Sequence, residues 1–560
     1  MAKYTYHEEH APAEIKKNLS HISPICLDIL YKRGYRTEKE MCDFILGDPS
    51  SILDSLDLKD SDRACQRLME ALGRGEQIVI YQDYDADGCC AAAVALECLR
   101  NLGADAVSYV NRREVDGYGI CAAGIDHIKK QYPRASLIVT VDNGIVAHEA
   151  IDYAATQGFD VVVTDHHEPG ETIPAAIAVV DPKRKDEDYP FHEFCGAGVI
   201  FKVMLKLFTK LGKPLDPVLD TLDIVALATV ADVVPLLGEN RILVREGISL
   251  IDKEKRPFFA ELRRITKAKQ INAHYTIGFI YGPMINSLCR MGQNPLLATS
   301  AMVSQDLDHV INVIDTMVET NQERKDETEA ETATCEKLIA QNDLEAAIVV
   351  KHHSFEEGIV GIVAGRLKSS YNRPTIVFSK ENQGILKGSC RSIPEVNVKK
   401  LLDEIQADTG LLVGYGGHEM AAGVSIKESD YPAFKDEFIG RVEKLLEGFD
   451  FTEQVELDTV IPAEELTVQA VQDLRMLEPF GQGFPRPVFG LVADCDDIRF
   501  MGQEMQHVKY LDRKHGISVI WWNAGEEVRK RGSKLRNKFI GYPELNFFND
   551  SVTVQFVVRD

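Results

Sequence analysis

The stretch IVIYQDYDADG, at residues 78 to 88, decides the fold of the first half of the chain. Its pattern, a short β-branched apolar run that ends in an acidic or histidine-bearing turn, returns as LIVTVDNG (137–144), VVVTDHHEPG (161–170) and AIAVVDPK (176–183). Runs this short and apolar, separated by helix-length segments, are typical of buried strands in a parallel α/β sheet. In such sheets the ligand crevice lies outside the carboxyl ends of the strands. The sequence therefore predicts one shared site made of Asp83, Asp85, Asp87, Asp142, Asp165, His166 and His167.

Carboxylates and imidazoles gathered at one edge of a sheet indicate a site for two divalent metal ions. Oxygen ligands with one or two histidines favour Mn²⁺ or Mg²⁺ over Zn²⁺, which more often recruits thiolates. Two such ions neutralise a phosphoryl group during in-line displacement, so the inferred chemistry is phosphoester hydrolysis. A single VDPK turn is more simply a turn former or a helix cap, and Asp181 is assigned a structural role for that reason.

A calcium loop is the alternative interpretation of DYDADG, because D-x-D-x-D-G also opens an EF-hand. That loop places a bidentate glutamate at its twelfth position, which is Val94 in this chain. The segment from Cys89 onward is already an apolar helix former. Both observations disfavour a calcium loop.

The composition is that of a globular protein with several domains. A chain of 560 residues is too long for one core, and 45% hydrophobic and 27% charged residues are ordinary proportions. The start, MAKYTYHEEHAPAE, has no apolar stretch behind a basic one, and no window approaches a membrane-spanning length. We therefore expect a cytoplasmic protein without a membrane partner. The twelve cysteines form no CxxC pair, which favours buried free thiols over zinc fingers or disulfides.

Changes in pattern divide the chain into five parts. Residues 1–75 look helical and carry no recognisable chemistry, and residues 76–317 hold the parallel sheet. A highly charged stretch without Gly or Pro, 318–345, predicts a solvated linker helix. Strands and helices alternate again in 346–448, which predicts a second α/β domain. From 451 to 560, short strands with one helical interruption suit a small barrel of the OB type.

The net charge of -24 argues against a nucleic-acid partner, because such binding places Lys and Arg at phosphates. The barrel segment is different, since nine Lys or Arg outnumber three acids between residues 505 and 540. Aromatic residues lie in or beside this basic stretch: Tyr510, Trp521, Trp522, Phe547 and Phe548. Bases stack on aromatic rings while cations bind the phosphates, so the segment predicts single-strand binding, although about half of the rings must form the barrel core.

Four motifs, DYDADG, VDNG, TDHH and ATVADVVPL, resemble in order and spacing those of the DHH phosphoesterase superfamily. GSCRS followed by GYGGHEMAAG resembles the companion DHHA1 domain. With the barrel segment and LEPFGQGFPRPVF (477–489), the chain is most similar to the superfamily's exonucleases, which degrade single-stranded DNA from the 5′ end. The resemblance implies a parallel-sheet DHH domain, a linker helix, a second α/β DHHA1 domain and a C-terminal OB-like β-barrel.

The resemblance also assigns roles to single residues. It places the metal ligands on Asp85, Asp87, Asp142, His166 and Asp232. It places His167 beside the scissile phosphate, with Asp83 adjacent, as catalytic groups. A 5′-phosphate pocket falls on Arg290, Ser389 and Arg391, drawn from both domains. GYGGHEMAAG is either a Gly-rich loop that brings His418 to the phosphate or a plain turn leading into a helix, and Arg113 and Tyr118 match a segment beside the catalytic groove.

The first hypothesis is therefore a metal-dependent exonuclease of DNA repair and recombination, with single-stranded DNA as substrate and a single-strand-binding protein and a helicase as candidate partners. One alternative is a phosphodiesterase acting on oligoribonucleotides or cyclic dinucleotides, although such relatives commonly lack the barrel. A catalytically inactive nucleic-acid scaffold is the other, and the retention of every Asp and His of the motifs counts against it. The superfamily's pyrophosphatases have a His where this chain has Tyr81, which argues against that activity.

Overall fold

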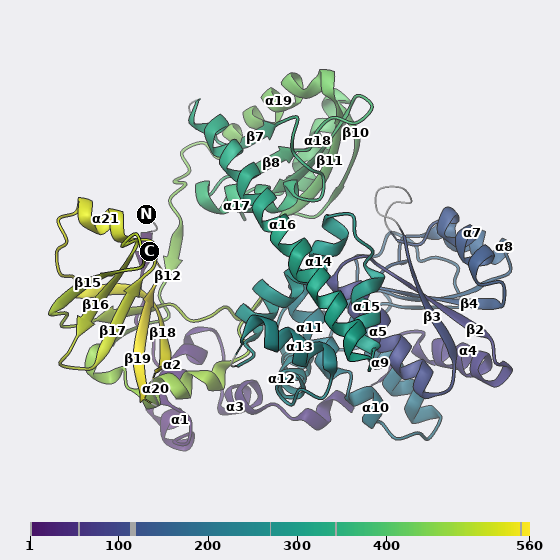
Figure 1. The fold of residues 1–560 in the computed structure, drawn as a ribbon, viewed down its shortest axis with the longest axis horizontal. Coiled ribbons are helices and arrows are strands. Elements are labelled where there is room, and N and C mark those ends of the chain that lie inside the picture. Colours follow the sequence, from purple (N-terminus) through teal and green to yellow (C-terminus); the bar gives the residue numbers. More distant parts are fainter. Residues whose placement is uncertain are drawn as a thin grey trace. The chain divides into compact units, whose positions relative to one another are not determined.

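The structure, a computed structural model, describes residues 3–53, 56–111, 119–268, 270–341, 344–548 and 551–559. The chain divides into two compact units. The first contains residues 1–282, 302–305 and 454–560, and the second contains residues 283–301 and 306–453. Figure 1 shows the elements of each unit. Within the described ranges, no helix combines the length and apolar character needed to cross a membrane.

A five-stranded parallel sheet forms part of the first unit (Figure 1). The strands lie in the order β3-β2-β4-β5-β6, and each neighbouring pair is parallel. Their bounds are β2 (Gln77–Gln82), β3 (Asp105–Val110), β4 (Ala135–Val141), β5 (Asp160–Thr164) and β6 (Ala178–Val180). The four predicted strands are confirmed, and β3 is an additional edge strand. The turns after β2, β4 and β5 consequently meet at one edge of the sheet.

Helices cover both faces of this sheet. On one face, Val79, Ile138 and Val163 share a core with residues of α7 and α8, while α5 and α9 contact the strands through the alternating side chains of the other face. A helical region follows, in which helix α11 is almost entirely buried. The helices are α4 (Ser61–Arg74), α5 (Ala86–Asn101), α7 (Ala122–Gln131), α8 (His148–Thr156), α9 (Gly196–Lys210), α10 (Asp216–Leu219), α11 (Leu222–Ala231), α12 (Gly238–Asp252), α13 (Pro257–Thr266) and the π-helix η2 (Ala273–Tyr281).

The C-terminal segment forms a mixed seven-stranded sheet in the order β13-β14-β18-β19-β17-β16-β15. Its strands are β13 (Thr459–Pro462), β14 (Phe489–Val492), β15 (Asp497–Met501), β16 (His507–Asp512), β17 (Ile517–Trp521), β18 (Lys538–Phe548) and β19 (Ser551–Val558). The helical segments are η4 (Ala463–Glu465), α20 (Val468–Asp473), η5 (Leu474–Leu477) and α21 (Gly525–Lys530). Tyr510 and Trp521 are buried in the core, whereas Trp522 and Phe547 are exposed. The side chain of Phe548 lies outside the described part.

The N-terminal elements are β1 (Lys3–Thr5), α1 (Ala13–Asn18), α2 (Pro24–Lys32), α3 (Glu38–Leu46) and the 3₁₀ helix η1 (Pro49–Leu53). Helices α2 and α3 pack into the core of this barrel domain, β1 pairs in parallel with β12 (Gln454–Glu456), and η1 contacts α12. Leu27, Leu30 and Phe44 belong to the same hydrophobic cluster as Trp521 and Phe556. The two ends of the chain therefore build one core.

Arg241, on α12, joins these elements to the helical region that follows the parallel sheet. Its guanidinium donates to the backbone carbonyls of Phe44, Leu477, Glu478 and Pro479 at 2.8–3.0 Å. It also lies 3.7 Å from the centre of the Phe44 ring. A buried cation is stable without a carboxylate partner when each of its guanidinium nitrogens donates to a carbonyl oxygen, as here.

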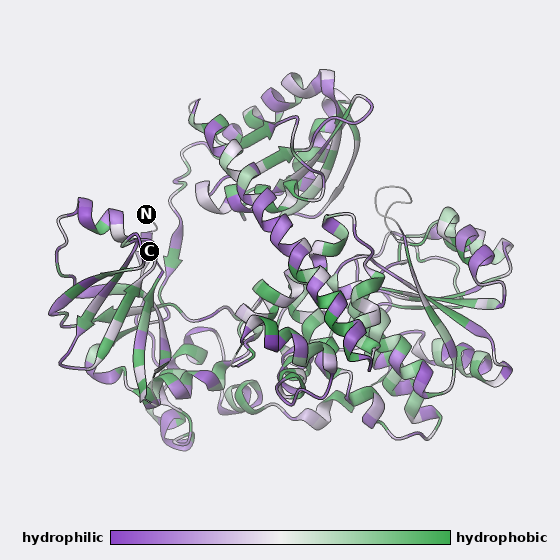
Figure 2. Ribbon diagram, viewed as in Figure 1, coloured by the Kyte–Doolittle hydropathy of each residue, from purple (hydrophilic) through white to green (hydrophobic). Residues whose placement is uncertain are grey.

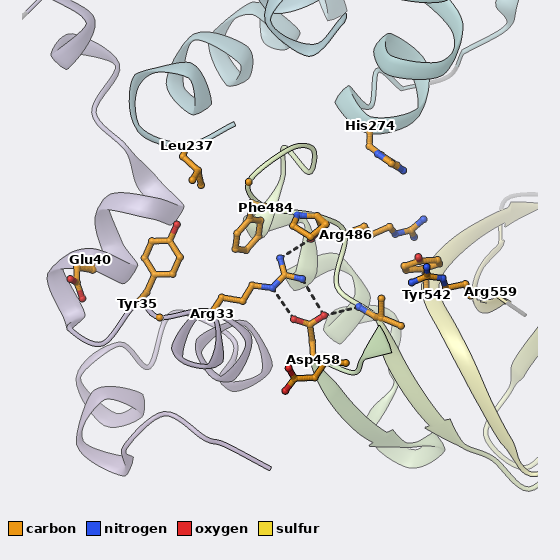
Figure 3. A pocket seen from close by; sticks show the side chains of 15 residues that line it. Arg33, Tyr35, Glu40, Leu237, His274, Asp458, Phe484, Arg486, Tyr542 and Arg559 are labelled. Carbon is orange, nitrogen blue, oxygen red and sulfur yellow. Dashed lines mark hydrogen bonds and ion pairs between the residues drawn. The ribbon is translucent and has the colours of Figure 1, made fainter. Parts of the chain in front are cut away.

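A cavity of about 910 Å³ lies in the first unit where α2 and α3 meet the barrel domain (Figure 3). Among the residues that line it, Arg33 forms a bidentate ion pair with Asp458, which also accepts the backbone N–H of Val488. Arg486 lies 4.8 Å from the centre of the Tyr542 ring and pairs with Glu544 at 2.9 Å. Since the charges of both arginines are balanced by neighbouring carboxylates, we assign these contacts to the stability of the junction.

The second unit contains a five-stranded mixed sheet in the order β10-β11-β9-β8-β7. Its strands are β7 (Ile348–Lys351), β8 (Thr375–Phe378), β9 (Ile385–Arg391), β10 (Leu412–Gly417) and β11 (Ala421–Lys427). Only β7 and β8 pair in parallel, and the other pairs are antiparallel. The helices are α14 (Gly282–Arg290), α15 (Leu296–Val303), α16 (Leu307–Ala340), α17 (Val360–Tyr371), α18 (Val398–Thr409), η3 (Glu428–Asp430) and α19 (Tyr431–Leu445).

The predicted linker helix is the long helix α16, which begins earlier than expected, at Leu307. Asp306 caps it by accepting the backbone N–H groups of Asp308 and His309. Much of its surface is hydrophilic (Figure 2), as the charged composition predicts.

Candidate active site

The turn after β2 supplies three carboxylates from the motif DYDADG. Asp85 caps α5 by accepting the backbone N–H of Gly88 at 3.0 Å, and Asp87 lies in the first turn of that helix. Asp87 is buried and accepts the backbone N–H groups of Gly196 and Ala197. A side chain at Gly88 would lie 2.6 Å from the carbonyl oxygen of Asp83, so only glycine allows α5 to begin this close to the strand end.

The turns after β4 and β5 bring Asp142 and His166 to the same place. The Nε2 atom of His166 lies 3.1 Å from a carboxylate oxygen of Asp142 and 3.7 Å from one of Asp87. Asp142 has a φ of 62°, a conformation that non-glycine residues seldom adopt. A side chain at Gly196 would lie 2.6 Å from the Cβ of Asp142. The glycine at the start of α9 thus leaves room for a strained aspartate, as is common at functional sites.

The last carboxylate comes from the helical region. Asp232 is the C-cap of α11, and its carboxylate lies 3.6 Å from the Nε2 atom of His166. Val233 follows it at a φ of 60°, a second strained residue beside the site. The motif ATVADVVPL therefore places its aspartate at the sheet edge by ending a buried helix there.

Three overlapping groups of these side chains have the geometry of metal sites. In each group one ligand atom from every residue lies within 4.8 Å of the others. The groups are Asp83 with Asp85 and Asp142, Asp87 with His166 and Asp232, and Asp142 with His166 and His167. Buried oxygens of Asp83 and Asp142 and both ring nitrogens of His166 have no hydrogen-bond partner in the part that the structure describes. Such orphaned lone pairs on hard oxygens, next to one imidazole, fit divalent Mn²⁺ or Mg²⁺.

The pKa values of these side chains also indicate a site for cations. Burial and the charge of Asp85 raise the pKa of Asp87 to about 6. Burial and neighbouring carboxylates likewise raise the pKa values of Asp83, Asp142 and Asp232 well above the usual range. Burial and the charge of His167 lower the pKa of His166 to about 3. Carboxylates crowded out of water repel one another, and bound cations remove that cost.

Asp165 holds the ring of His167 in place. The carboxylate of Asp165 lies 2.7 Å from Nδ1 of His167 and accepts the backbone N–H groups of Ile145, His166 and His167. Burial lowers the pKa of His167, but the hydrogen bond with Asp165 and nearby carboxylates outweigh it and raise this pKa to about 9. The sequence pattern groups Asp165 with the site but gives it no role, and the contact with His167 supplies one.

The predicted phosphate-binding residues that the structure describes lie in the second unit. Arg391 donates to the Oγ of Ser389 at 2.9 Å, both on β9. Arg290, at the end of α14, donates to the carbonyl oxygen of Gly358 at 3.2 Å. His418 is exposed at the tip of the hairpin formed by β10 and β11. GYGGHEMAAG is thus a hairpin and not a turn leading into a helix, while Arg113 and Tyr118 lie outside the described residues.

Family models match most of the chain. The DHH family N-terminal domain matches residues 77–229, the DHHA1 domain matches 344–447, and the RecJ OB domain matches 457–560. Single-stranded-DNA-specific exonuclease RecJ of Escherichia coli is 33% identical over 95% of this chain and 96% of its own length. The chain belongs to the RecJ family. RecJ of Bacillus subtilis is also 33% identical, over 96% of this chain and 68% of its own.

Solved RecJ structures share the fold. Thermus thermophilus RecJ in complex with Mn²⁺ superposes with a TM-score of 0.83 at 28% identity, covering 100% of this chain and 79% of that chain. An exonuclease RecJ bound to manganese gives a TM-score of 0.60 at 32% identity over 70% of this chain and 96% of that one. These similarities confirm the predicted order of DHH domain, linker helix, DHHA1 domain and OB-like barrel for this RecJ-family chain.

Proposed function

We propose that this protein is a metal-dependent exonuclease that hydrolyses phosphodiester bonds of single-stranded DNA from the 5′ end, in DNA repair and recombination. The observation that carries the proposal is the set of three overlapping carboxylate and imidazole groups at one sheet edge. The RecJ relatives that align over nearly the whole chain are single-stranded-DNA-specific exonucleases.

The metal ligands in this proposal are Asp85, Asp87, Asp142, His166 and Asp232. They hold two ions, Mn²⁺ or Mg²⁺, the metals named for the Thermus thermophilus RecJ complexes. When bound, such ions make a nucleophile available at neutral pH and neutralise phosphoryl charge. The backbone N–H groups of Gly196 and Ala197 fix the orientation of the Asp87 carboxylate. The site is therefore preorganised for its ligands.

His167 and Asp83 are the proposed catalytic groups of the chain itself. With Nδ1 of His167 engaged by Asp165, its Nε2 is the atom available to hold or deliver a proton at the scissile phosphate. Asp83 is buried beside Asp85, and burial and that charge raise its pKa. A buried carboxyl group at this position can orient a water molecule by hydrogen bonding.

In this proposal, residues of the second unit determine the direction of digestion by binding the 5′ end. We assign Arg290, Ser389, Arg391 and His418 to the terminal 5′-phosphate and its neighbouring backbone. Guanidinium groups with a hydroxyl suit a phosphate, because their hydrogen bonds are charge-assisted and directional. Arg113 and Tyr118 complete the proposed substrate contacts beside the catalytic groove.

Strand binding by the barrel domain completes the proposal. Trp522 and Phe547 are exposed on a domain with a local surplus of cations. Exposed aromatic rings beside cations allow proteins to bind single strands without sequence preference. A single-strand-binding protein and a helicase are the proposed partners, and the cytoplasm is the proposed location.

Digestion of 5′-labelled and 3′-labelled single strands of DNA and RNA tests the function. The expected result is release of the 5′ label from DNA first, with Mn²⁺ or Mg²⁺ and not with chelator. Preferential digestion of short RNA or cyclic dinucleotides would support the phosphodiesterase alternative instead. Binding of DNA without any hydrolysis under every metal condition would support the inactive scaffold.

A further inference from the structure

Asn143, the residue after the proposed metal ligand Asp142, is completely buried at the carboxyl end of the parallel sheet. Its Nδ2 donates to the backbone carbonyls of Val141, at 2.9 Å, and of Tyr81, at 3.0 Å. These two residues lie at or next to the ends of β4 and β2. A side-chain amide can take the place of a backbone donor. Asn143 therefore continues the hydrogen bonding of two strands at the edge that carries the metal ligands.

The contact with Val141 spans Asp142 and fixes its backbone. The side chain of Asn143 reaches back across Asp142 to the carbonyl of Val141, while the backbone N–H of Asp142 donates to the carbonyl of Thr164 at 3.0 Å. Asp142 has a left-handed backbone conformation, with a φ of 62°, which is unfavourable for a residue other than glycine. Such a conformation persists only where the surrounding structure holds it. Asn143 thus stabilises the conformation in which the Asp142 carboxylate meets His166.

The oxygen of the Asn143 amide binds a third stretch of the chain. Its Oδ1 accepts the backbone N–H of Ile120 at 3.1 Å. The neighbouring Gly119 packs against the same side chain, since a Cβ at Gly119 would lie 3.6 Å from the Cβ of Asn143. Both N–H groups and the oxygen of the amide are therefore engaged, which fixes its orientation. Through this one side chain the turn of Asp142 is joined to the Gly119–Ile120 backbone.

Tyr81 holds the same backbone through its hydroxyl group. This hydroxyl donates to Oδ1 of Asn111, and Nδ2 of Asn111 donates to the carbonyl oxygen of Gly119. Both side chains are buried. A side chain at Gly124, on α7, would lie 2.1 Å from the Tyr81 hydroxyl, so this glycine leaves the space that the hydroxyl occupies. Gly119 and Ile120 are consequently held by two separate hydrogen bonds, one through Asn111 and one from Asn143.

We propose that Asn143 and Tyr81 are positioning residues: Asn143 holds the metal ligand Asp142, and the two together fix the Gly119–Ile120 backbone beside it. The proposal rests on the proposed function, in which two residues of the stretch 112–118, directly before Gly119 in the sequence, bind the strand. Asn143 and Tyr81 act through other residues, because both side chains are completely buried. Their hydrogen bonds keep the metal ligand and the backbone next to the substrate-binding stretch in a constant relation, as preorganised catalysis requires.

The first test measures metal binding without substrate. Asn143→Ala should weaken Mn²⁺ binding by about 10- to 100-fold, as expected when a residue that orients a metal ligand is lost. Calorimetric titration of metal-free protein with Mn²⁺ measures this change. A large excess of Mn²⁺ should then restore most of kcat, because the Asp142 carboxylate itself is still present. A folded Asn143→Ala protein with wild-type affinity for Mn²⁺ would overturn the proposal.

The second test uses Tyr81→Phe, which removes only the hydroxyl group. KM for a DNA single strand should rise by roughly three- to tenfold, as expected for one lost buried hydrogen bond. Mn²⁺ affinity, and kcat at saturating Mn²⁺, should stay at the wild-type level, because the backbone carbonyl of Tyr81 still accepts from Asn143. This separation of KM from metal affinity distinguishes positioning from general damage to the site. An unchanged KM contradicts the proposal, also where Asn143→Ala does not fold.

Asn372→Ala is the matched control. Asn372 also has a left-handed φ, of 50°, and its Nδ2 donates to the carbonyl of Phe451 at 2.9 Å, but it belongs to the second unit. This variant should unfold at a lower temperature with unchanged Mn²⁺ affinity and KM. An equal loss of Mn²⁺ affinity in the control would mean that reduced stability explains the effect, and would overturn the proposal. Failure of the proposed function gives a different result, because the wild-type protein would then digest no strand while calorimetry still compares the variants.

Discussion

The carboxylate of Asp165 lies 2.7 Å from Nδ1 of His167. The same carboxylate is fixed by the backbone N–H groups of Ile145 and His166, so its position does not depend on the histidine. A ring nitrogen engaged in this way fixes the orientation of the ring and leaves the other nitrogen for substrate.

Asp165→Asn should therefore reduce kcat with little change in metal affinity. The amide keeps the size of the side chain but loses the charge that favours the protonated imidazole, and we expect a loss of about 10- to 100-fold. Single-turnover digestion together with Mn²⁺ titration calorimetry measures both quantities. Loss of Mn²⁺ binding that parallels the loss of rate would instead place Asp165 among the ligands' direct supports.

Asp142→Ala and His166→Ala should abolish hydrolysis while leaving the fold intact. Each removes a ligand atom from overlapping groups, and we expect a rate loss of at least about 1000-fold. Asp181→Asn is the matched control, because burial and the charge of Asp165 raise the pKa of Asp181 to about 8, so its carboxyl is already neutral at pH 7. Near-normal activity of either alanine variant, with circular dichroism unchanged, would refute the assignment of the metal centre.

Arg391→Ala should weaken the preference for a 5′-phosphate over a 5′-hydroxyl. Arg391 is held by the Oγ of Ser389, so its fork has a fixed direction. Removing one charge-assisted donor should cost roughly 10- to 100-fold in that preference. The ratio of kcat/KM for the two strands measures it, with Arg441→Gln as control because Arg441 pairs with Asp408 and Glu437. Full retention of the preference would place the terminal phosphate elsewhere.

Unpaired cations of the barrel domain should govern binding to long single strands. Lys509, Lys534 and Lys538 form no ion pair with the residues described, and their triple change to glutamine should weaken binding. The magnitude of the slope of log K against log salt should fall by about 2, because each lost phosphate contact removes about 0.7. Lys514→Gln with Lys530→Gln, whose partners are Asp494 and Glu526, is the control. Equal effects of both sets would mean that overall charge, not these lysines, governs binding.

Stability of the second unit should depend on pH through Glu331. Its Oε1 accepts the backbone N–H of Glu356, its Oε2 is buried without a hydrogen-bond partner among the described residues, and burial raises its pKa to about 7. A folded-state pKa above the unfolded value means that stability is lost as pH rises from about 4.5 to 7. Glu331→Gln should therefore be more stable than wild type at pH 8, by on the order of 2 kcal/mol, and similar at pH 5. Urea unfolding, with the exposed Glu336→Gln as control, checks this.

The sequence was most informative where strands are buried on both faces. The interior strands β2, β4 and β5 are continuous apolar runs that end in acidic turns, so both the sheet and its ligand edge were predictable. The edge strand β3 is only half-buried, and the polar residues in it hid its role. Strand β18 contains Gly541 and Pro543, which weigh against a strand in any local pattern.

Contacts between distant parts of the chain were not predictable. Nothing local marks Asp165 as the partner of His167 rather than as one more ligand, because the distinction depends on which way the carboxylate faces. The sequence before residue 75 indicates helices but no role for them, because α2 and α3 pack against strands that lie more than four hundred residues away in the chain. Arg241 and Arg67 look alike in sequence, yet one donates to carbonyl oxygens and the other pairs with Glu76 and Asp160.

The core shared by the two ends of the chain has a consequence for biosynthesis. The apolar faces of α2 and α3 leave the ribosome before the strands that cover them, which follow more than four hundred residues later in the chain. At roughly 5–20 residues per second, the early helices wait about 20 to 100 s for their partner strands. During that time Leu27, Leu30 and Phe44 have no native partner to pack against. Messages that end before the codons for these strands should therefore yield nascent chains that chaperones retain or proteases remove.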